Sequence, residues 1–210
     1  MNLKQYQCPF PFVVIDDFAP PALLKGALAE WPDEKWPFWH VYQDQYAVKL
    51  ASKDPSRVPP CATRLLGKMS DIPVEGWFRD NEVFPDFTLY GAGLHELKPG
   101  GYLKAHLDSE VHPSTGWVRA LSGVLCVSDD WQSEWGGQLQ FLDSSTKEVK
   151  QCLEMKFNRL VIFQCQGGSW HQVAPITKEA TSSRKTIAMF WWRKATQEEL
   201  KSPRTQAHFA

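Results

Sequence analysis

The sequence has few cysteines and no cysteine pair with the spacing of a metal site. Its five cysteines are odd in number, far apart and without a C-x-x-C motif, so neither a disulfide framework nor a zinc knuckle is indicated. The N-terminal stretch lacks the apolar core and cleavage site of a signal peptide, and no Asn-x-Ser/Thr acceptor occurs. We therefore expect reduced thiols and a cytoplasmic protein.

A surplus of basic residues and a long apolar run are also absent. The 23 Lys and Arg residues are balanced by 24 Asp and Glu, which leaves a net charge of −1. This balance argues against the basic surface that nucleic-acid phosphates require. No apolar run approaches the roughly 20 residues of a membrane-spanning helix. We expect a protein that binds neither nucleic acid nor membranes, and the sequence leaves its oligomeric state open.

What the sequence does contain fits one globular domain over residues 1–210. This length can bury a continuous core, and 43% of the residues are hydrophobic. Aromatic residues make up 13% of the chain and include ten Trp. Packing is the commoner role for Trp, but an aromatic surface for substrate is an alternative. The candidates for such a substrate-binding surface are Trp31, Trp36, Trp39, Trp77 and Trp117.

The local pattern changes near residue 88. Residues 1–87 predict a strand over 12–18, a helix over 22–31 and a second helix over 61–69, with many prolines and irregular chain between them. The tail from Thr196 predicts a surface helix or a frayed end. Between them, eight short β-prone runs without intervening helices predict two packed antiparallel sheets, a jelly-roll or related sandwich. These runs cover residues 88–97, 101–107, 119–127, 138–142, 148–153, 159–164, 170–173 and 185–192.

His106 and Asp108 are the first candidates for chemistry. They form an H-x-D motif in a predicted strand, where residues two apart point to the same face, so both side chains can reach one metal ion. His171 begins another predicted strand, and a sandwich can bring distant strands face to face. Two His and one carboxylate on one face form the 2-His-1-carboxylate arrangement of non-heme Fe(II) oxygenases.

Arg184 and Thr186 extend this set. They share a face of the last predicted strand, and a guanidinium beside a hydroxyl suits a dicarboxylate such as 2-oxoglutarate. Four further segments frame these residues: Gly100-Gly101-Tyr102-Leu103, the run Arg119–Val127 leading to Asp130-Trp131, Trp135-Gly136-Gly137-Gln138-Leu139, and the run Asn158–Phe163.

From about residue 88 to 192 the chain resembles a 2-oxoglutarate and Fe(II)-dependent oxygenase of the prolyl 4-hydroxylase-like superfamily. The resemblance implies a mainly β fold with flanking helices around a double-stranded β-helix, a jelly-roll or cupin-like core. It implies a catalytic core over 88–192, with 1–87 as a helical and irregular support region. It also implies Fe(II) bound by His106, Asp108 and His171, with a carboxylate of 2-oxoglutarate held by Arg184. O2 is the other cosubstrate, and ascorbate is a candidate reductant.

The sequence departs from the family at the cosubstrate pocket. Cys126 and Leu97 stand where the family often has Tyr, and Tyr102 is displaced by one residue. Because strand faces alternate, this displacement predicts that Tyr102 points away from the metal. Thr186 or Ser122 is then expected to complete the pocket.

Two other histidines lie near the motifs. We expect a structural or supporting role for His95 and an exposed loop position for His112.

The function that these residues favour is hydroxylation of an amino-acid side chain, free or in a peptide or protein, coupled to decarboxylation of 2-oxoglutarate to succinate. The same chemistry on a non-peptide small molecule or sugar is an alternative. A non-catalytic jelly-roll binding module is an alternative of another class. Oxidation of methylated nucleic-acid bases is disfavoured by the neutral charge.

Overall fold

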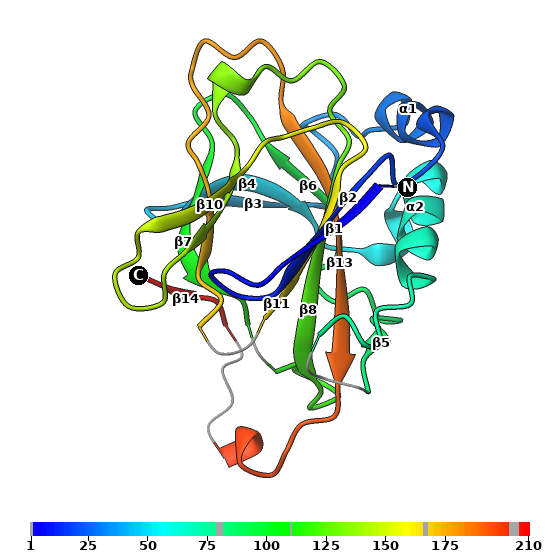
Figure 1. The fold of residues 1–210 in the computed structure, drawn as a ribbon. Coiled ribbons are helices and arrows are strands. Elements are labelled where there is room, and N and C mark those ends of the chain that lie inside the picture. The colour runs from blue at the N-terminus through cyan, green and yellow to red at the C-terminus, as the bar shows by residue number, and fades with distance from the viewer. Residues whose placement is uncertain (1, 79–81, 110, 166–167, 202–205) are drawn as a thin grey trace.

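The computed structural model describes residues 2–78, 82–109, 111–165, 168–201 and 206–210. They form a curled antiparallel sheet with two α-helices against one face (Figure 1). The helices are α1 (Pro21–Ala29) and α2 (Pro60–Ser70), each begun by a proline whose fixed φ suits the first turn. Short 3-10 turns lie at Pro55–Arg57, Ser133–Trp135 and Glu199–Lys201. No helix among these residues could span a membrane.

The strands run along the whole chain and confirm the mainly β prediction. In chain order they are β1 (Asn2–Tyr6), β2 (Phe12–Asp16), β3 (Trp39–Gln43), β4 (Ala47–Ser52), β5 (Phe84–Pro85), β6 (Gly93–Leu97), β7 (Tyr102–Leu107), β8 (Val118–Cys126), β9 (Leu139–Leu142), β10 (Val149–Leu153), β11 (Leu160–Gln164), β12 (His171–Val173), β13 (Arg184–Arg193) and β14 (His208–Phe209).

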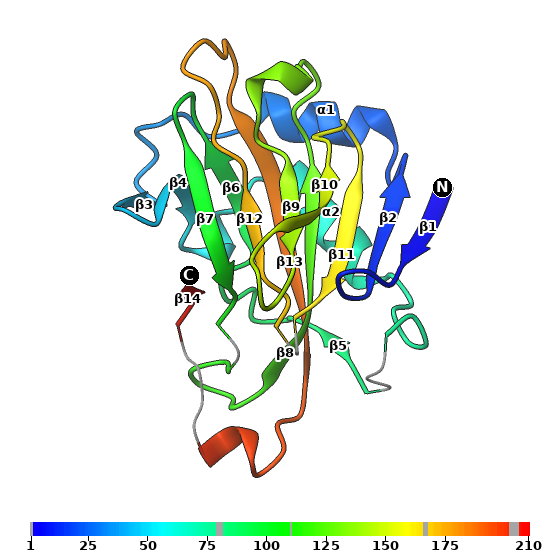
Figure 2. The ribbon, with the colours of Figure 1, turned by 60° about the vertical axis from the view of Figure 1, so that its left-hand side comes forward.

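Hydrogen bonds connect the strands in the order β1-β2-β11-β8-β13-β6-β4-β7-β12-β9-β10. The sheet curls on itself, so that β7, β12, β9 and β10 lie in front of β6, β13 and β8 in the view of Figure 2. This arrangement makes two facing layers. The helices cover the outer face of the layer that contains β8 and β13 (Figures 1 and 2).

Alternation along the strands divides the core in two. In β11, Leu160 and Ile162 pack toward the helices, whereas Val161 and Phe163 pack between the two layers with Phe141 of β9. A strand buried on both faces must be apolar at consecutive positions, which is why this segment reads as an unbroken apolar run. The inter-layer core closes one end of the sandwich.

The N-terminal part supplies strands as well as helices: besides β2, which matches the strand predicted over 12–18, it contributes β1, β3, β4 and β5. The β3–β4 hairpin lies in the stretch predicted to be irregular. Leu50 and Ala51 of β4 pair with β6, while Ala47 and Val48 pair with β7. The hairpin thus joins the two layers. Its partners are distant in sequence, so local patterns carry no signal for it.

Two other predicted elements differ from the structure. The strand expected over 88–97 begins only at Gly93, because the Asp86 carboxylate accepts hydrogen bonds from the backbone and hydroxyl of Thr88 and holds a turn. The tail expected to be a helix or frayed end has a short 3-10 turn and then β14, which pairs with β7.

The five tryptophans considered for substrate binding have packing roles. Trp39 is buried, and Trp31, Trp36 and Trp77 pack against the core between helices and sheet. Trp117 packs against a smaller cluster that contains Phe190 and Trp192 of β13. Their indoles cover the sheet rather than form a binding surface.

Gly123 marks the tightest contact between β8 and the core. A Cβ added there would lie 2.8 Å from Cζ3 of Trp191, which is fully buried and cannot move aside. We predict that Gly123→Ala lowers the free energy of unfolding by about 1–3 kcal/mol, the usual cost of overpacking. Urea unfolding monitored by tryptophan fluorescence measures it.

Gly67 provides the matched control. It lies on the exposed face of α2, and an added Cβ would meet no atom within 4 Å. Gly67→Ala should leave stability unchanged or raise it by up to about 1 kcal/mol, because Ala favours the helix. Equal unfolding midpoints for the two variants would contradict the packing argument.

Candidate active site

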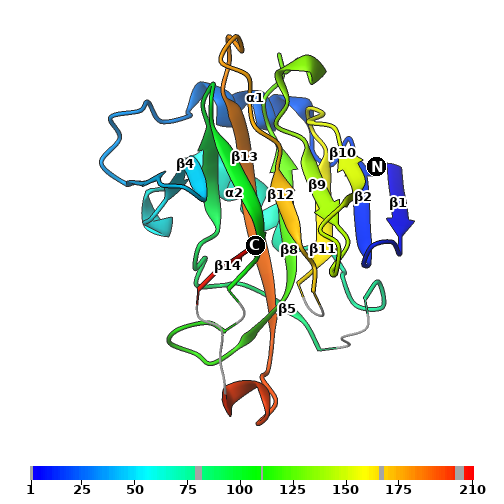
Figure 3. The same cartoon turned by 90° about the vertical axis from the view of Figure 1, so that its left-hand side faces the viewer.

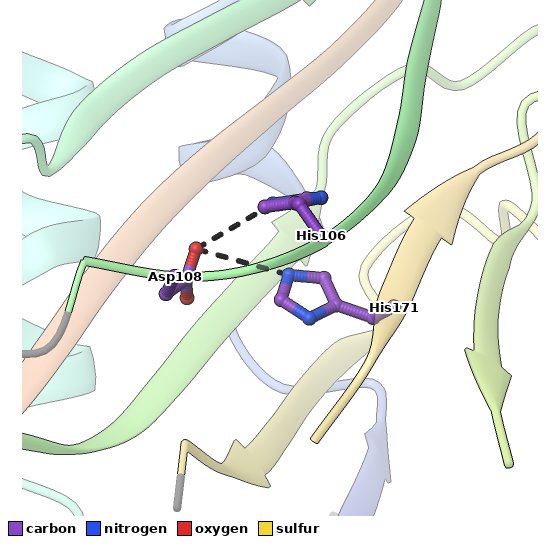
Figure 4. Close-up of side chains that lie close together, drawn as sticks. All are labelled: His106, Asp108 and His171. Carbon is purple, nitrogen blue, oxygen red and sulfur yellow. Dashed lines mark ion pairs between the residues drawn. The ribbon is translucent and has the colours of Figure 1, made fainter. Parts of the chain in front are cut away.

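The structure brings His106, Asp108 and His171 together between the two layers. His106 lies in β7, Asp108 follows this strand, and His171 opens β12, where it pairs directly with His106 (Figure 4). One nitrogen or oxygen atom from each residue lies within 4.8 Å of the others. The Nε2 atoms of His106 and His171 are 3.6 and 3.8 Å from Oδ1 of Asp108.

Both imidazoles are held with Nε2 facing the carboxylate. Nδ1 of His106 is 2.8 Å from the carbonyl oxygen of Lys104, and Nδ1 of His171 is 3.0 Å from that of Ser169. A carbonyl only accepts, so each Nδ1 donates its proton there, and Nε2 is the ring nitrogen that faces the site. Burial, followed by the neighbouring His106, lowers the pKa of His171 to about 4. A metal ion binds the imidazole nitrogen that carries no proton, so an Nδ1–H directed at a carbonyl makes Nε2 the metal-binding atom.

Asp108 is supported from β8. Its Oδ2 accepts a hydrogen bond of 2.7 Å from the Ser122 hydroxyl and lies 3.3 Å from Nη1 of Arg119. Burial alone would raise the pKa of Asp108, but the charge of Arg119 holds it well below its usual range. Oδ2 is thus used for support while Oδ1 faces the imidazoles.

Two imidazoles and one ionised carboxylate on one side of a cavity are the donor set of a non-heme Fe(II) site. Backbone carbonyls orient the two imidazoles, and Ser122 and Arg119 orient the carboxylate, a pattern common around metal ligands. The residues therefore fit a divalent iron ion.

An inner cavity extends from these residues to Arg184. Its wall includes Thr186 and, from β6, Leu97. Arg184 is buried, and its Nε donates a 2.7 Å hydrogen bond to the carbonyl of Gly137. Among the described residues no carboxylate lies within 4.0 Å of its guanidinium. A buried guanidinium needs an anionic partner, so this end of the cavity suits a carboxylate ligand.

The positions where the family often has Tyr supply no hydroxyl to this cavity. Leu97 lies opposite Arg184 in the β6–β13 register and presents an apolar side chain. The Tyr102 hydroxyl instead donates to the carbonyl of Asp44, and neither Tyr102 nor Cys126 is among the residues that line the cavity. The Ser122 hydroxyl lines it but donates to Asp108, which leaves Thr186 as the remaining hydroxyl predicted to complete the pocket.

His112 corrects one expectation. It is buried rather than exposed: its Nδ1 accepts from the backbone of Ser114 and Thr115, and its Nε2 lies 3.0 Å from the Thr88 hydroxyl, which bonds to Asp86. Because Nδ1 is the acceptor, Nε2 donates to Thr88. His112 thus ties the loop after Asp108 to the turn before β6.

His95 lines the inner cavity but lies outside the His-Asp-His group, and it contacts the carbonyl of Gly91. Burial and the nearby Lys49 lower the pKa of His95 to about 3.

Three groups at the site were missed from sequence. Arg119 belongs to the run Arg119–Val127, and a charged residue at the start of an apolar strand is the signal that could have identified it; its guanidinium lies 3.6 Å from the Phe190 ring centroid. Lys49 of β4 lines the cavity but belongs to no motif. The short strand β14 lies beside β7 (Figure 3), where Phe209 pairs with His106 and their ring centroids are 5.5 Å apart.

An outer cleft leads from His106 and Asp108 toward solvent. It is bounded by the β3–β4 hairpin, the turn at 88–91, the loop after Asp108 and residues 206–209 near the C-terminus. His106 and Asp108 line both this cleft and the inner cavity. The candidate metal position is therefore reached from two sides, one ending at Arg184 and the other open.

Comparison with known proteins agrees with this chemistry. Residues 92–193, about half of the chain, match the model of the 2OG-Fe(II) oxygenase superfamily. No curated protein matches by sequence.

Solved structures with the same fold include a prolyl-4-hydroxylase from Pseudomonas putida, with TM-score 0.62, 20% identity, and coverage of 88% of this chain and 93% of that one. A Trichoplax adhaerens prolyl hydroxylase in complex with a hypoxia inducible factor peptide fragment has TM-score 0.59, 13% identity, and coverage of 86% and 83%.

A viral collagen prolyl hydroxylase from Paramecium Bursaria Chlorella virus-1, in a 2OG complex, has TM-score 0.59, 11% identity, and coverage of 86% and 95%. These likenesses confirm the predicted double-stranded β-helix. The family match carries the identification: the chain belongs to the 2OG-Fe(II) oxygenase superfamily and is a 2-oxoglutarate-dependent non-heme iron dioxygenase that uses Fe(II), 2-oxoglutarate and O2.

Proposed function

We propose that this dioxygenase hydroxylates an amino-acid side chain, free or in a peptide or protein, with His106, Asp108 and His171 as its Fe(II) ligands. Arg184 and Thr186 are the proposed contacts of 2-oxoglutarate. The observation that carries the proposal is the place of the donor group, at the junction of a cavity that ends on a buried guanidinium and a cleft open to solvent.

Each residue has a distinct task in this proposal. Arg184 fixes the distal carboxylate of the cosubstrate at the closed end of the cavity, and Thr186 donates a hydrogen bond beside it. Arg119 and Ser122 keep Asp108 ionised and oriented. Leu97, Leu103 and Phe163 surround the cavity with apolar side chains that exclude water. Bound iron supplies the oxidation, in which 2-oxoglutarate loses CO2 to give succinate and one oxygen atom enters the substrate.

The choice of an amino-acid side chain rests on the similar structures. All three are described as prolyl hydroxylases, and one holds a peptide fragment. The open outer cleft offers room for such a segment. A non-peptide small molecule or sugar remains the alternative substrate, because the cleft is formed by segments outside the matching motifs.

The intact donor group and buried Arg184 argue against a non-catalytic module. The catalytic core at 88–192, its support region at 1–87, the use of ascorbate and the lack of nucleic-acid binding stay predictions.

The first prediction concerns the iron ligands. Anaerobic addition of Fe(II) and 2-oxoglutarate to the wild-type protein should give a weak metal-to-ligand charge-transfer band. His106→Ala should abolish the band and weaken metal binding by more than about 100-fold, because loss of a ligand exceeds the 10- to 100-fold effect of losing a ligand's support.

His40→Ala serves as the control, since His40 is exposed on β3 and lies outside the donor group. A band of wild-type strength in His106→Ala, or no band in the wild type, would contradict the ligand assignment.

The second prediction concerns the cosubstrate. Arg184→Gln removes the charge at the end of the inner cavity. Since hydrogen bonds to charged groups contribute about 1.5–3 kcal/mol each, loss of a two-point contact should raise the 2-oxoglutarate concentration at half-saturation by about 100-fold or more. Titration of the charge-transfer band with 2-oxoglutarate measures it.

Thr186→Val is the matched variant, because it removes one neutral hydroxyl and keeps the shape of the side chain. It should raise the half-saturation concentration by about 10-fold or less. Fe(II) affinity without cosubstrate should stay unchanged in both variants. An unchanged 2-oxoglutarate titration in Arg184→Gln would refute its role.

A further inference from the structure

Lys49 occupies a position that neither the motifs nor the proposed function uses. Its side chain projects from β4 and lines both the inner cavity and the outer cleft. It shares this place with His95, His106 and Asp108, which line both spaces as well. Lys49 therefore lies where the inner cavity, proposed to hold 2-oxoglutarate, meets the outer cleft, through which the substrate would enter.

The ammonium group of Lys49 has no carboxylate within 4.0 Å among the described residues. Its Nζ lies 5.0 Å from the ring centroid of Tyr42, a cation–π contact that leaves other sides of the group available. Burial lowers the pKa of Lys49 to about 8, and the charge of Asp108 acts in the opposite direction. The side chain is thus mostly protonated at neutral pH although it is partly withdrawn from water.

The other charges of the outer cleft do not neutralise Lys49. Asp108 is paired with Arg119 and faces the imidazoles. The Asp44 carboxylate accepts hydrogen bonds from the backbone of Tyr46 and Ala47. Lys53 and Arg119 also line the cleft, so three positive charges there face the two carboxylates of Asp44 and Asp108. Among the described residues the entrance to the site therefore has an excess of positive charge, although the chain as a whole is nearly neutral.

We propose that Lys49 binds a carboxylate of the substrate, so that this enzyme acts on a molecule with an anionic group held beside the metal. The inference rests on the proposed function. In the proposed function Arg184 holds the distal carboxylate of 2-oxoglutarate, and the other carboxylate would bind at the metal. Lys49, which also lines the outer cleft, can then bind the substrate that enters through this cleft. The carboxylate is either the α-carboxylate of a free amino acid or an acidic side chain in a peptide.

Equilibrium binding to the protein loaded with Fe(II) and 2-oxoglutarate under argon tests this proposal. One arm uses a panel of free L-amino acids against the corresponding amino-acid amides. The other uses end-blocked peptides with Glu or Asp against the same peptides with Gln or Asn. Binding is measured by calorimetry and by the change in the charge-transfer band, so it does not depend on turnover.

At least one carboxylate probe should bind the wild-type protein, and its uncharged counterpart should bind roughly 10- to 100-fold more weakly. Lys49→Met keeps the length of the side chain. It should weaken binding of the carboxylate probe by the same factor, without changing the 2-oxoglutarate titration.

Lys53→Met is the matched control, because Lys53 is exposed in the cleft and does not line the inner cavity. It should change binding by less than about 3-fold, as expected for an exposed charge. The arm that responds identifies the source of the carboxylate.

Three results would overturn the inference: equal binding of carboxylate and uncharged probes, no binding of any carboxylate probe, or a raised 2-oxoglutarate requirement in Lys49→Met, which would make Lys49 a cosubstrate ligand. Failure of the proposed function would show itself differently, as absence of the charge-transfer band in the wild-type protein before any probe is added.

Discussion

The two central strands β8 and β13 are buried on both faces, and the position of the site residues depends on how their side chains alternate. In β13, Ile187, Met189 and Trp191 pack toward the helices. The intervening residues Arg184, Thr186, Ala188 and Phe190 line the inner cavity. A shift of one residue in register would exchange these two sets. The helices thus contribute to function by keeping one face of β13 buried, which holds the other face toward the metal donors.

The charged groups of the site form one connected series of contacts. Arg119 lies against the Phe190 ring and beside Asp108, which faces His106 and His171. The support of Asp108 comes from β8, whereas the imidazoles come from β7 and β12. The donor group therefore depends on closure of the two layers, and the β3–β4 hairpin and the inter-layer core bring about that closure.

The outer cleft differs from the inner cavity in its origin. The inner cavity is lined mainly by strands of the matched region, whose alternation can be followed in the sequence. The outer cleft is formed by a hairpin, two loops and residues 206–209, which meet only in the folded chain. Substrate choice in such an enzyme is separated from its chemistry, since the segments that select the substrate can change without moving the metal donors.

The sequence by itself predicted the candidate donor set and the strands that carry it. His106 and Asp108 share a face because the side-chain period of a strand is two, and the same rule joins Arg184 to Thr186; these relations are local. Only the tertiary structure decided that Lys49 reaches the site, that Ser122 serves Asp108 and that His112 is buried. It also decided that β4 joins the layers and β14 covers His106. These contacts pair segments far apart in the chain, and such pairing leaves no periodic signal within either segment.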